Sequence, residues 1–424
     1  MNDTNEKKHA LLPKGIIFPF ILLSSCFMWW GIANNITDPL VRVFMAVFRE
    51  LSTFEASLIQ FAFYGGYFCM AVPGAIIARK YSYKTGVLVG LGLYATGCLL
   101  LYPSTLAQQF VFFCISYYVL ACGLGILETN ANPYILAIGP ESTATQRLNF
   151  AQSFNPIGSI IGILLCQILI MARLPQVDGN IVIPKGGEAD ALSTVIFPYL
   201  SVAGCLVVVW ILILITKMPR ISEHDHKAHV GETVRRLLGN GNYTFSVVAQ
   251  FFYVGAQITV WTYTNFYIPE HIEGITPADV LKYHTVALIL FGASRWIFTW
   301  LMKSIKASTL LLVASIAASI LTLLVIFVGG MIGVCSLIGI SIFMSLMFPT
   351  IFGLGCQGLG EDTKLGASGL IMAILGGALI TPLQGAMIDW FNVDLSYLLP
   401  LLCFVVIGCY SLVSGKIERS HLTD

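Results

Sequence analysis

Two acidic residues, Asp38 and Glu128, lie inside long apolar stretches of the sequence. A charged side chain at the centre of a bilayer costs roughly 2.5–3.5 kcal/mol on insertion scales, so acidic residues in such stretches usually face a cavity and have a function. An isolated carboxyl group can take up and release protons. These two residues therefore predict a pathway for an ion or a substrate, with the proton as the natural cargo.

Asp38 lies in the segment Asn34–Pro39, toward the outer part of the first apolar stretch, since a helix rises 1.5 Å per residue from Gly15 onward. The chain stays apolar beyond Asp38, which favours a carboxylate in a water-filled cavity that is open to the outside. A solvated residue at the outer mouth is the alternative interpretation.

Glu128 lies in the middle of the fourth apolar stretch, and no Lys or Arg is near it in the sequence. Burial without a cationic partner disfavours the charged form of a carboxyl group. Such a group can load and release a proton as its surroundings alternate between wet and dry. A neutral structural glutamate that is bonded to another helix is the alternative.

Polar and aromatic residues share helix faces in two later stretches. Gln152 and Asn155 are three residues apart, so they lie on one face of a helix. A longer stripe at helical spacing consists of Gln250, Tyr253, Gln257, Trp261 and Thr264. Amides and hydroxyls suit a sugar, and an aromatic ring can stack on the apolar face of one. Hydrogen bonding between helices is the alternative explanation for these residues.

Arg295 is the basic residue that lies well inside an apolar stretch, and we expect it to bind substrate or to balance a carboxylate in one conformation. No metal site is expected. The histidines at positions 224, 226 and 229 are interpreted as part of a solvated linker, because no further ligands cluster near them. The 11 cysteines are scattered singly and are interpreted as small buried hydrophobic residues.

The stretches that must position these residues are long enough to cross a membrane. The chain is 57% hydrophobic and 11% charged, whereas a typical soluble domain has about 25% charged residues. The net charge of +1 gives no indication of nucleic-acid binding. A membrane helix needs about 20 apolar residues. Twelve stretches qualify, at residues 15–45, 54–78, 85–103, 108–138, 146–173, 194–217, 242–271, 278–303, 307–329, 331–359, 366–390 and 395–416.

The polar segment Met218–Gly241 divides these twelve stretches into six and six. Pro133–Gly139 in the fourth stretch matches Pro349–Gly355 in the tenth, which indicates an internal repeat. Most Lys and Arg lie in the loops and ends on the side of the two termini, so both termini are predicted to be cytoplasmic. We predict an all-α integral membrane protein, with a six-helix bundle in residues 1–217, a cytoplasmic linker in 218–241 and a second bundle in 242–424. Two parallel halves of this kind are the layout of major facilitator transporters.

Several motifs together resemble the fucose–galactose–glucose:proton symporter family, a branch of the major facilitator superfamily, and the likeness is closest to its L-fucose carriers. They are Trp30-x-x-Ala33-Asn34-Asn35-x-x-Asp38, Glu128-Thr-x-Ala131-Asn132-Pro133, Arg147-Leu-Asn149-x-Ala-Gln152-x-Phe154-Asn155, Gln250-Phe-x-Tyr253-Val-Gly-Ala-Gln257 and Asp362-Thr-Lys364-x-Gly366. The resemblance implies a proton-coupled sugar symporter of the bacterial inner membrane. It also implies that Asp38 and Glu128 take part in proton coupling and sugar binding, and that Gln152 and Asn155 line a polar cavity.

We therefore expect symport of a monosaccharide, L-fucose foremost, by a monomer in which two bundles rock about a central cavity. The predicted substrate contacts are Asn35, Gln152, Asn155, Tyr253, Gln257, Trp261 and Arg295. The proton gradient would be the energy source, with no cofactor, because the chain has no ATP-binding loop. It also has no catalytic motif of a hydrolase or a metalloprotease, which argues against an enzyme. A galactose/glucose symporter, a passive sugar facilitator and a non-transporting membrane sugar sensor remain the alternatives.

Overall fold

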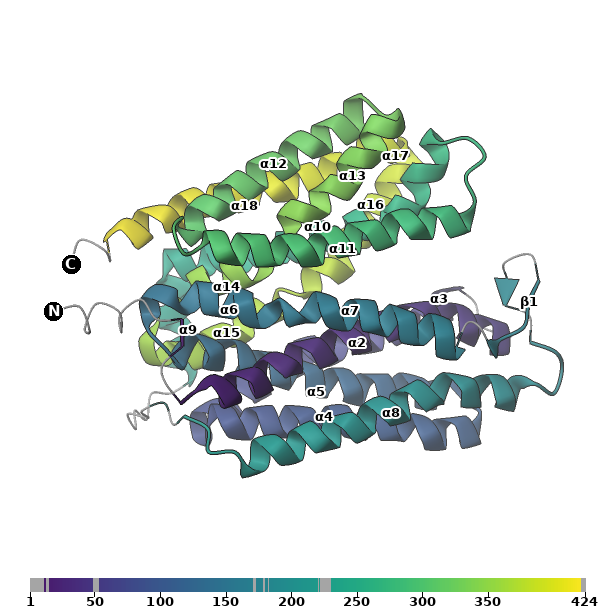
Figure 1. The fold of residues 1–424 in the computed structure, drawn as a ribbon, viewed down its shortest axis with the longest axis horizontal. Coiled ribbons are helices and arrows are strands. Elements are labelled where there is room, and N and C mark those ends of the chain that lie inside the picture. The colour runs from purple at the N-terminus through teal and green to yellow at the C-terminus, as the bar shows by residue number, and fades with distance from the viewer. Residues whose placement is uncertain are drawn as a thin grey trace. The chain divides into compact units, whose positions relative to one another are not determined.

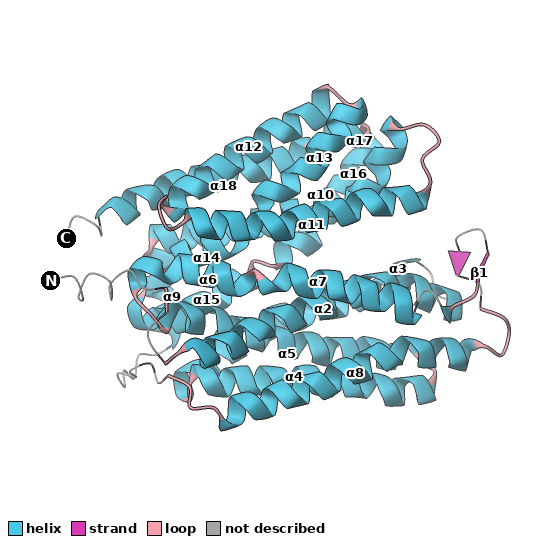
Figure 2. Ribbon diagram, in the orientation of Figure 1, coloured by secondary structure: helices cyan, strands magenta, loops and turns pink. Residues whose placement is uncertain are grey.

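The computed structural model describes residues 11–12, 15–48, 53–170, 173–177, 180–181, 183–219, 221 and 230–420. Helices make up almost all of this part of the chain (Figures 1 and 2). A short antiparallel pair of strands, β1 (Gln176–Val177) and β2 (Asn180–Ile181), lies before α8. The all-helical fold class is therefore the one that the sequence predicts.

The helices of the first half of the chain follow the predicted stretches closely. They are α2 (Ile17–Val47), α3 (Thr53–Lys80), α4 (Tyr83–Ala107), α5 (Phe110–Ala137), η1 (Glu141–Thr143), α6 (Ala144–Gln152), α7 (Phe154–Leu165), the π-helical turn η2 (Cys166–Ile170) and α8 (Glu188–Ile215). The fifth predicted stretch is thus formed by several helical pieces in succession.

The second half begins with a short helix inside the predicted linker. Its elements are α9 (Val230–Gly239), α10 (Gly241–His271), α11 (Pro277–Leu301), α12 (Ala307–Phe327), α13 (Gly330–Met344), α14 (Met347–Cys356), η4 (Gly360–Asp362), α15 (Thr363–Met372), α16 (Leu375–Trp390), α17 (Val393–Ser396) and α18 (Leu398–Ser420). The tenth and eleventh predicted stretches are also broken helices, formed by α13 with α14 and by α15 with α16.

Ten helical segments of the described chain are long and apolar enough to cross a membrane. They match ten of the twelve predicted stretches. The other two predicted stretches coincide with α2, whose apolar part is Ile17–Ala33, and with the long helix α10. Side-chain caps fix several helix starts. Ser82 accepts a hydrogen bond from the Thr85 amide at the start of α4, and Thr276 and Asp279 form a capping box at the start of α11.

Contacts between residues group the chain into two compact units. One unit contains residues 14–134 and 154–220, and in it α2 packs on α7 and α4 packs on α8. The other contains residues 1–13, 135–153 and 221–424, and in it α12 packs on α18 and α10 packs on α16. Helix α6 belongs to this second unit, where it packs on α11 and α14. The domain bounds inferred from the sequence stay a prediction.

Candidate functional site

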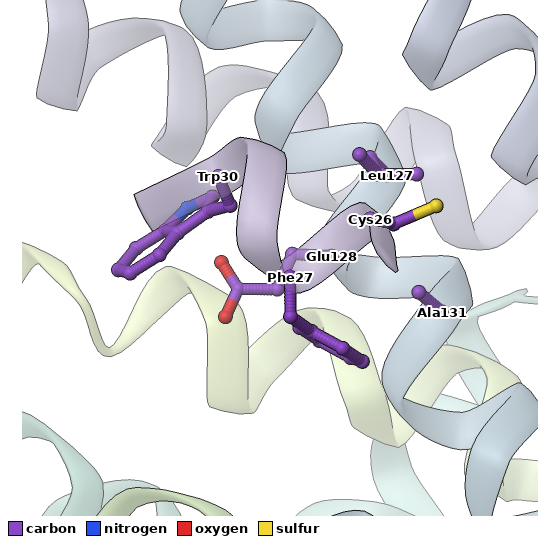
Figure 3. Close-up of a pocket in the computed structure, with 6 residues that line it drawn as sticks. All are labelled: Cys26, Phe27, Trp30, Leu127, Glu128 and Ala131. Carbon is purple, nitrogen blue, oxygen red and sulfur yellow. The ribbon is translucent and has the colours of Figure 1, made fainter. Parts of the chain in front are cut away.

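Glu128 lies on α5, and its side chain is buried, with 6% of the residue exposed. It lines a small cavity that is partly open to solvent. The other lining residues are Cys26, Phe27, Trp30, Leu127 and Ala131. Figure 3 shows the carboxylate of Glu128 near the rings of Trp30 and Phe27, which both come from α2. The predicted proton-binding group therefore sits in apolar and aromatic surroundings.

The Glu128 carboxyl group has little polar support. Its Oε2 atom is buried and has no hydrogen-bond partner among the described residues. Asn132, one turn further along α5, provides the polar side chain that interacts with this carboxyl group. Among the ion pairs between described residues, none includes Glu128. A buried charge is costly without a partner, so this site suits a carboxyl group that changes its protonation state during a working cycle.

The aromatic residues next to Glu128 are themselves hydrogen-bonded. The indole nitrogen of Trp30 donates to the hydroxyl group of Tyr67 on α3. Helices α3 and α5 approach each other closely here, because a Cβ atom at Gly125 would lie 3.1 Å from Tyr67 Cα. Gly125 is one turn before Glu128 on α5, so this close packing brings Tyr67 near the acidic residue.

Asn155 reaches the same part of α2 from α7. Its Nδ2 atom donates to the Phe27 carbonyl oxygen at 3.3 Å. The contact depends on glycines, because a side chain at Gly31 of α2 would overlap the main chain at Asn155, and one at Gly158 of α7 would overlap the main chain of Met28. Phe27 thus touches both Asn155 and the Glu128 cavity.

The two remaining predicted residues of this unit lie further along α2. Asn35 is half-buried, and its amide donates to the Gly31 carbonyl oxygen at 3.0 Å. Asp38 falls within the residues of α2, but its side chain lies outside the described part of the structure. The unit therefore brings Asn35, Glu128 and Asn155 to neighbouring turns of α2, and the role of Asp38 stays a prediction.

The other unit holds the predicted aromatic residues on α10. Tyr253 is fully buried, and its hydroxyl group donates to the Met344 carbonyl oxygen at 3.0 Å. Trp261 is half-buried, donates to Ser341 Oγ at 3.1 Å, and packs edge-on against Phe291 at 5.1 Å between ring centroids. Gln257 lies between them on α10 and is half-buried.

Gln152 and Arg295 meet in this second unit. Gln152 is the last residue of α6 and is buried, with 4% of it exposed. The Arg295 Nη1 atom on α11 donates to the Gln152 carbonyl oxygen at 2.9 Å. Arg295 also donates from Nε to the Ser345 carbonyl oxygen at 2.6 Å. The arginine therefore binds main-chain oxygens, which the sequence alone did not indicate.

A model of the Major Facilitator Superfamily matches residues 20–382 of the chain. The chain belongs to this superfamily. It is 44% identical to the L-fucose-proton symporter of Haemophilus influenzae, over 96% of this chain and 99% of that one. It is 37% identical to the L-fucose-proton symporter of Escherichia coli, over 95% of this chain and 94% of that one. The glucose/galactose transporter of Brucella abortus is 33% identical, over 97% and 98% of the two chains.

A solved structure shows the same fold at high similarity. The crystal structure of the major facilitator transporter FucP in the outward conformation superposes with a TM-score of 0.86 and 36% identity, over 94% of this chain and 99% of that chain. The proton:xylose symporter XylE, at 13% identity and a TM-score of 0.71, shares the fold alone. The family inferred from the sequence motifs is therefore confirmed, and these relatives are transporters and not enzymes.

Two residues that contribute to the site geometry were not among the residues predicted from the sequence. Phe27 lines the Glu128 cavity and accepts the hydrogen bond of Asn155 through its carbonyl group. Tyr67 accepts the hydrogen bond of Trp30. Phe27 carries no pattern that distinguishes it from other apolar residues of α2. Tyr67 follows the pair Gly65-Gly66, and a glycine pair in a membrane helix is a signal of close helix packing that could have directed attention to it.

Proposed function

We propose that this protein is a proton-coupled symporter that brings a monosaccharide into the cell, with L-fucose as the substrate. The two relatives at 44% and 37% identity are L-fucose-proton symporters, and they match nearly the whole chain. The observation that carries the proposal within the structure is Glu128. Its carboxyl group is buried and forms no ion pair with a described residue. It lies next to Trp30 and Phe27, and Phe27 accepts a hydrogen bond from Asn155. This arrangement suits proton binding close to a sugar.

We assign the residues as follows. Glu128 and Asp38 take up the protons that accompany the sugar. Sugar hydroxyl groups bind the amides and the phenol, and Trp261 offers an aromatic ring to the sugar's apolar face. The proposed substrate contacts are Asn35, Gln152, Asn155, Tyr253, Gln257 and Trp261. Arg295, which the sequence also predicts as a contact, acts on the sugar through Gln152, whose carbonyl oxygen it binds. Polar residues in membrane segments mark substrate pathways by default, and Gln152, Asn155 and Arg295 lie in helical segments that are long and apolar enough to cross a membrane.

We also propose an energy source for transport and a location for the protein in the cell. The proton gradient drives uptake, and no cofactor takes part. The protein is a multi-pass protein of the bacterial inner membrane with both termini in the cytoplasm, since Lys and Arg concentrate on the side of the termini. We propose that the monomer is the functional unit, with the lipid bilayer and the sugar as its partners.

Sugar-induced proton movement tests this function. Cells or vesicles that contain the protein are given L-fucose without an imposed gradient, and the external pH is recorded. A symporter carries protons inward with the sugar, so the external medium becomes more alkaline. If L-fucose, galactose and glucose all fail to move protons in protein that still binds one of them, symport is wrong.

Galactose or glucose is the second candidate substrate, because the transporter from Brucella abortus is 33% identical over nearly the full length. A counterflow panel of sugars separates the candidates, since counterflow requires no energy source. A passive facilitator would show counterflow without alkalinisation. A sugar sensor would bind its sugar and show neither.

A further inference from the structure

Arg295 makes an unusual set of contacts for a buried cation. Only 3% of the residue is exposed. Its Nε atom donates to the Ser345 carbonyl oxygen at 2.6 Å, and its Nη1 atom donates to the Gln152 carbonyl oxygen at 2.9 Å. The guanidinium carbon lies 4.7 Å from the centre of the Phe291 ring, one turn earlier on α11. These four residues belong to one compact unit.

Both carbonyl groups lie four residues before a proline. Gln152 precedes Pro156, and Ser345 precedes Pro349. In an α-helix each carbonyl oxygen accepts from the amide four residues later, but proline has no N–H, and its ring clashes with that carbonyl group. The helix is interrupted at each place, between α6 and α7 and between α13 and α14. Each proline therefore leaves one carbonyl group without its helical partner.

The charge of Arg295 fits these two acceptors. Carbonyl groups at the C-terminal end of a helix carry partial negative charge, and α6 ends at Gln152 while α13 ends at Met344. Arginine presents five donors in a planar fork, so a single side chain can serve two oxygens in different directions. Lysine is a point charge on a flexible chain and cannot reproduce this geometry.

Other side chains strengthen the same contact. The Tyr253 hydroxyl donates to the Met344 carbonyl oxygen at 3.0 Å, beside the Ser345 carbonyl. Helix α6 is held to α14 by the hydrogen bond from Asn149 Nδ2 to Thr350 Oγ1 at 3.1 Å. It is held to α11 by the bond from Gln146 Nε2 to the Thr299 carbonyl oxygen, also at 3.1 Å. Arg295 thus lies at the end of a row of bonds that joins α6 to its neighbours.

We propose that Arg295 is a positioning residue, which ties the broken fifth span to the broken tenth span through the two carbonyl groups that Pro156 and Pro349 leave without helical partners. It thereby sets the position of Gln152, a proposed sugar contact. This last step rests on the proposed sugar transport, whereas the link between the two helix breaks does not.

A thermal-stability cycle tests the link without any sugar. The variant R295M keeps a long apolar side chain but removes the guanidinium donors to both carbonyl groups, so we expect a lower apparent Tm than that of the unchanged protein. The changes P156A and P349A restore an amide donor to Gln152 and Ser345, respectively. Each should raise the Tm of R295M more than it raises the Tm of the unchanged protein, because the effects of interacting residues are not additive.

Pro103 provides the matched control, because it lies inside the helix α4 and none of the contacts of Arg295 described above involves that helix. P103A should change the Tm equally with and without R295M. If P156A and P349A are also additive with R295M, the proposal is overturned. Amide hydrogen exchange supplies a local readout: R295M should speed exchange in peptides that cover residues 149–153 and 343–348, and unchanged exchange at both breaks would contradict the link.

Transport kinetics test the step to the sugar. In folded protein, R295M should raise the KM for L-fucose counterflow about tenfold, which corresponds to about 1.4 kcal/mol of binding, and R295K should recover only part of it. The KM of the double variant R295M/Q152A should be no higher than that of Q152A alone, because Arg295 acts on the sugar through Gln152. Additive losses would indicate a direct sugar contact and overturn the positioning role. If the unchanged protein carries no sugar, the proposed function fails, while the stability cycle still decides the link.

Discussion

At the scale of single residues, the buried charged groups of this protein find different kinds of partner. Arg295 and Arg147 bind main-chain oxygens, and Arg147 donates to the carbonyl groups of Ile135, Leu136 and Pro140 at the end of α5. Glu128 has a buried oxygen atom that finds no hydrogen-bond partner within the part of the chain that the structure describes. A charged group that is hydrogen-bonded to fixed main-chain atoms suits a structural role. A group without such hydrogen bonds suits a role in which it gains and loses a proton.

The variant E128Q should separate coupling from binding. Glutamine keeps the size of the side chain and can both donate and accept hydrogen bonds, as a protonated glutamate can, but it cannot exchange a proton. We expect uphill accumulation of L-fucose and sugar-induced alkalinisation to be lost, while counterflow is retained. Radiolabelled uptake and counterflow in the same vesicles measure both properties.

Glu141 offers the matched control for this change, because it is an exposed glutamate in η1. E141Q removes a carboxyl group of the same kind and should leave accumulation intact. Full accumulation in E128Q would show that the proton is carried elsewhere. Loss of counterflow in E128Q would show that the residue is needed for sugar binding itself.

The sequence was sufficient to find Glu128 but not to find the partners of Arg295. A carboxylate in an apolar stretch is visible as a break in composition. The two oxygens that Arg295 binds belong to the main chain, and they are available because of Pro156 and Pro349. The prolines can be read from the sequence as helix breaks, but the sequence does not tell which distant side chain reaches the freed carbonyl group.

At the scale of elements, the close contact of α2 with α7 positions Asn155. A side chain at Gly158 would overlap the main chain of Met28. We expect G158A to push the helices apart and to lower stability by about 1–3 kcal/mol, the usual cost of overpacking. The apparent Tm in detergent measures the loss. L-fucose affinity should fall as well, because Asn155 donates to Phe27 on the other side of this contact.

Gly204 in α8 provides the comparison for this prediction. No atom lies within 4 Å of the place where its Cβ would be, and alanine favours the helix over glycine by about 1 kcal/mol. G204A should therefore keep or raise the Tm. If G158A is as stable as G204A, the packing of α2 on α7 is looser than the structure indicates.

Arg147 has the same relation to α5 that Arg295 has to the two broken spans. It is completely buried, and its Nε atom lies 2.7 Å from the Ile135 carbonyl oxygen. A buried polar group that loses its partner costs about 1–3 kcal/mol, and R147A would leave several carbonyl groups in this condition. We expect a large fall in Tm, with faster amide exchange at residues 135–143. The Tm of R147K should lie between those of R147A and the unchanged protein, because one ammonium group cannot serve all these oxygens. An unchanged Tm in R147A would show that these hydrogen bonds do not stabilise the end of α5.

The helix breaks also explain why the membrane spans could be predicted but the points where they are interrupted could not. The predicted stretch at 146–173 was long and apolar, and the structure divides it into α6, α7 and η2. Apolar composition shows that a segment lies in the membrane, but it does not show where the helix is interrupted. The same holds for 331–359, which contains Pro349 and is divided into α13 and α14.

At the scale of the whole molecule, the length of apolar segments determined most of what the sequence predicts correctly. About 20 apolar residues are needed for one crossing, so a chain that is 57% hydrophobic can be divided into spans by counting. The contacts of α6 could not be predicted by counting apolar residues. It is close in sequence to α7 but packs on α11 and α14, which are more than a hundred residues away.

The driving force for uptake is a property of the whole molecule, and it provides the last prediction. If the protein is a symporter, an imposed gradient with the acidic side outside should drive L-fucose into vesicles above its external concentration. A protonophore should abolish this accumulation but leave counterflow unchanged, because counterflow needs only the movement of the loaded carrier. A passive facilitator would reach equal concentrations in both conditions. Accumulation that survives the protonophore would require another energy source and would contradict proton coupling, whichever residues bind the sugar.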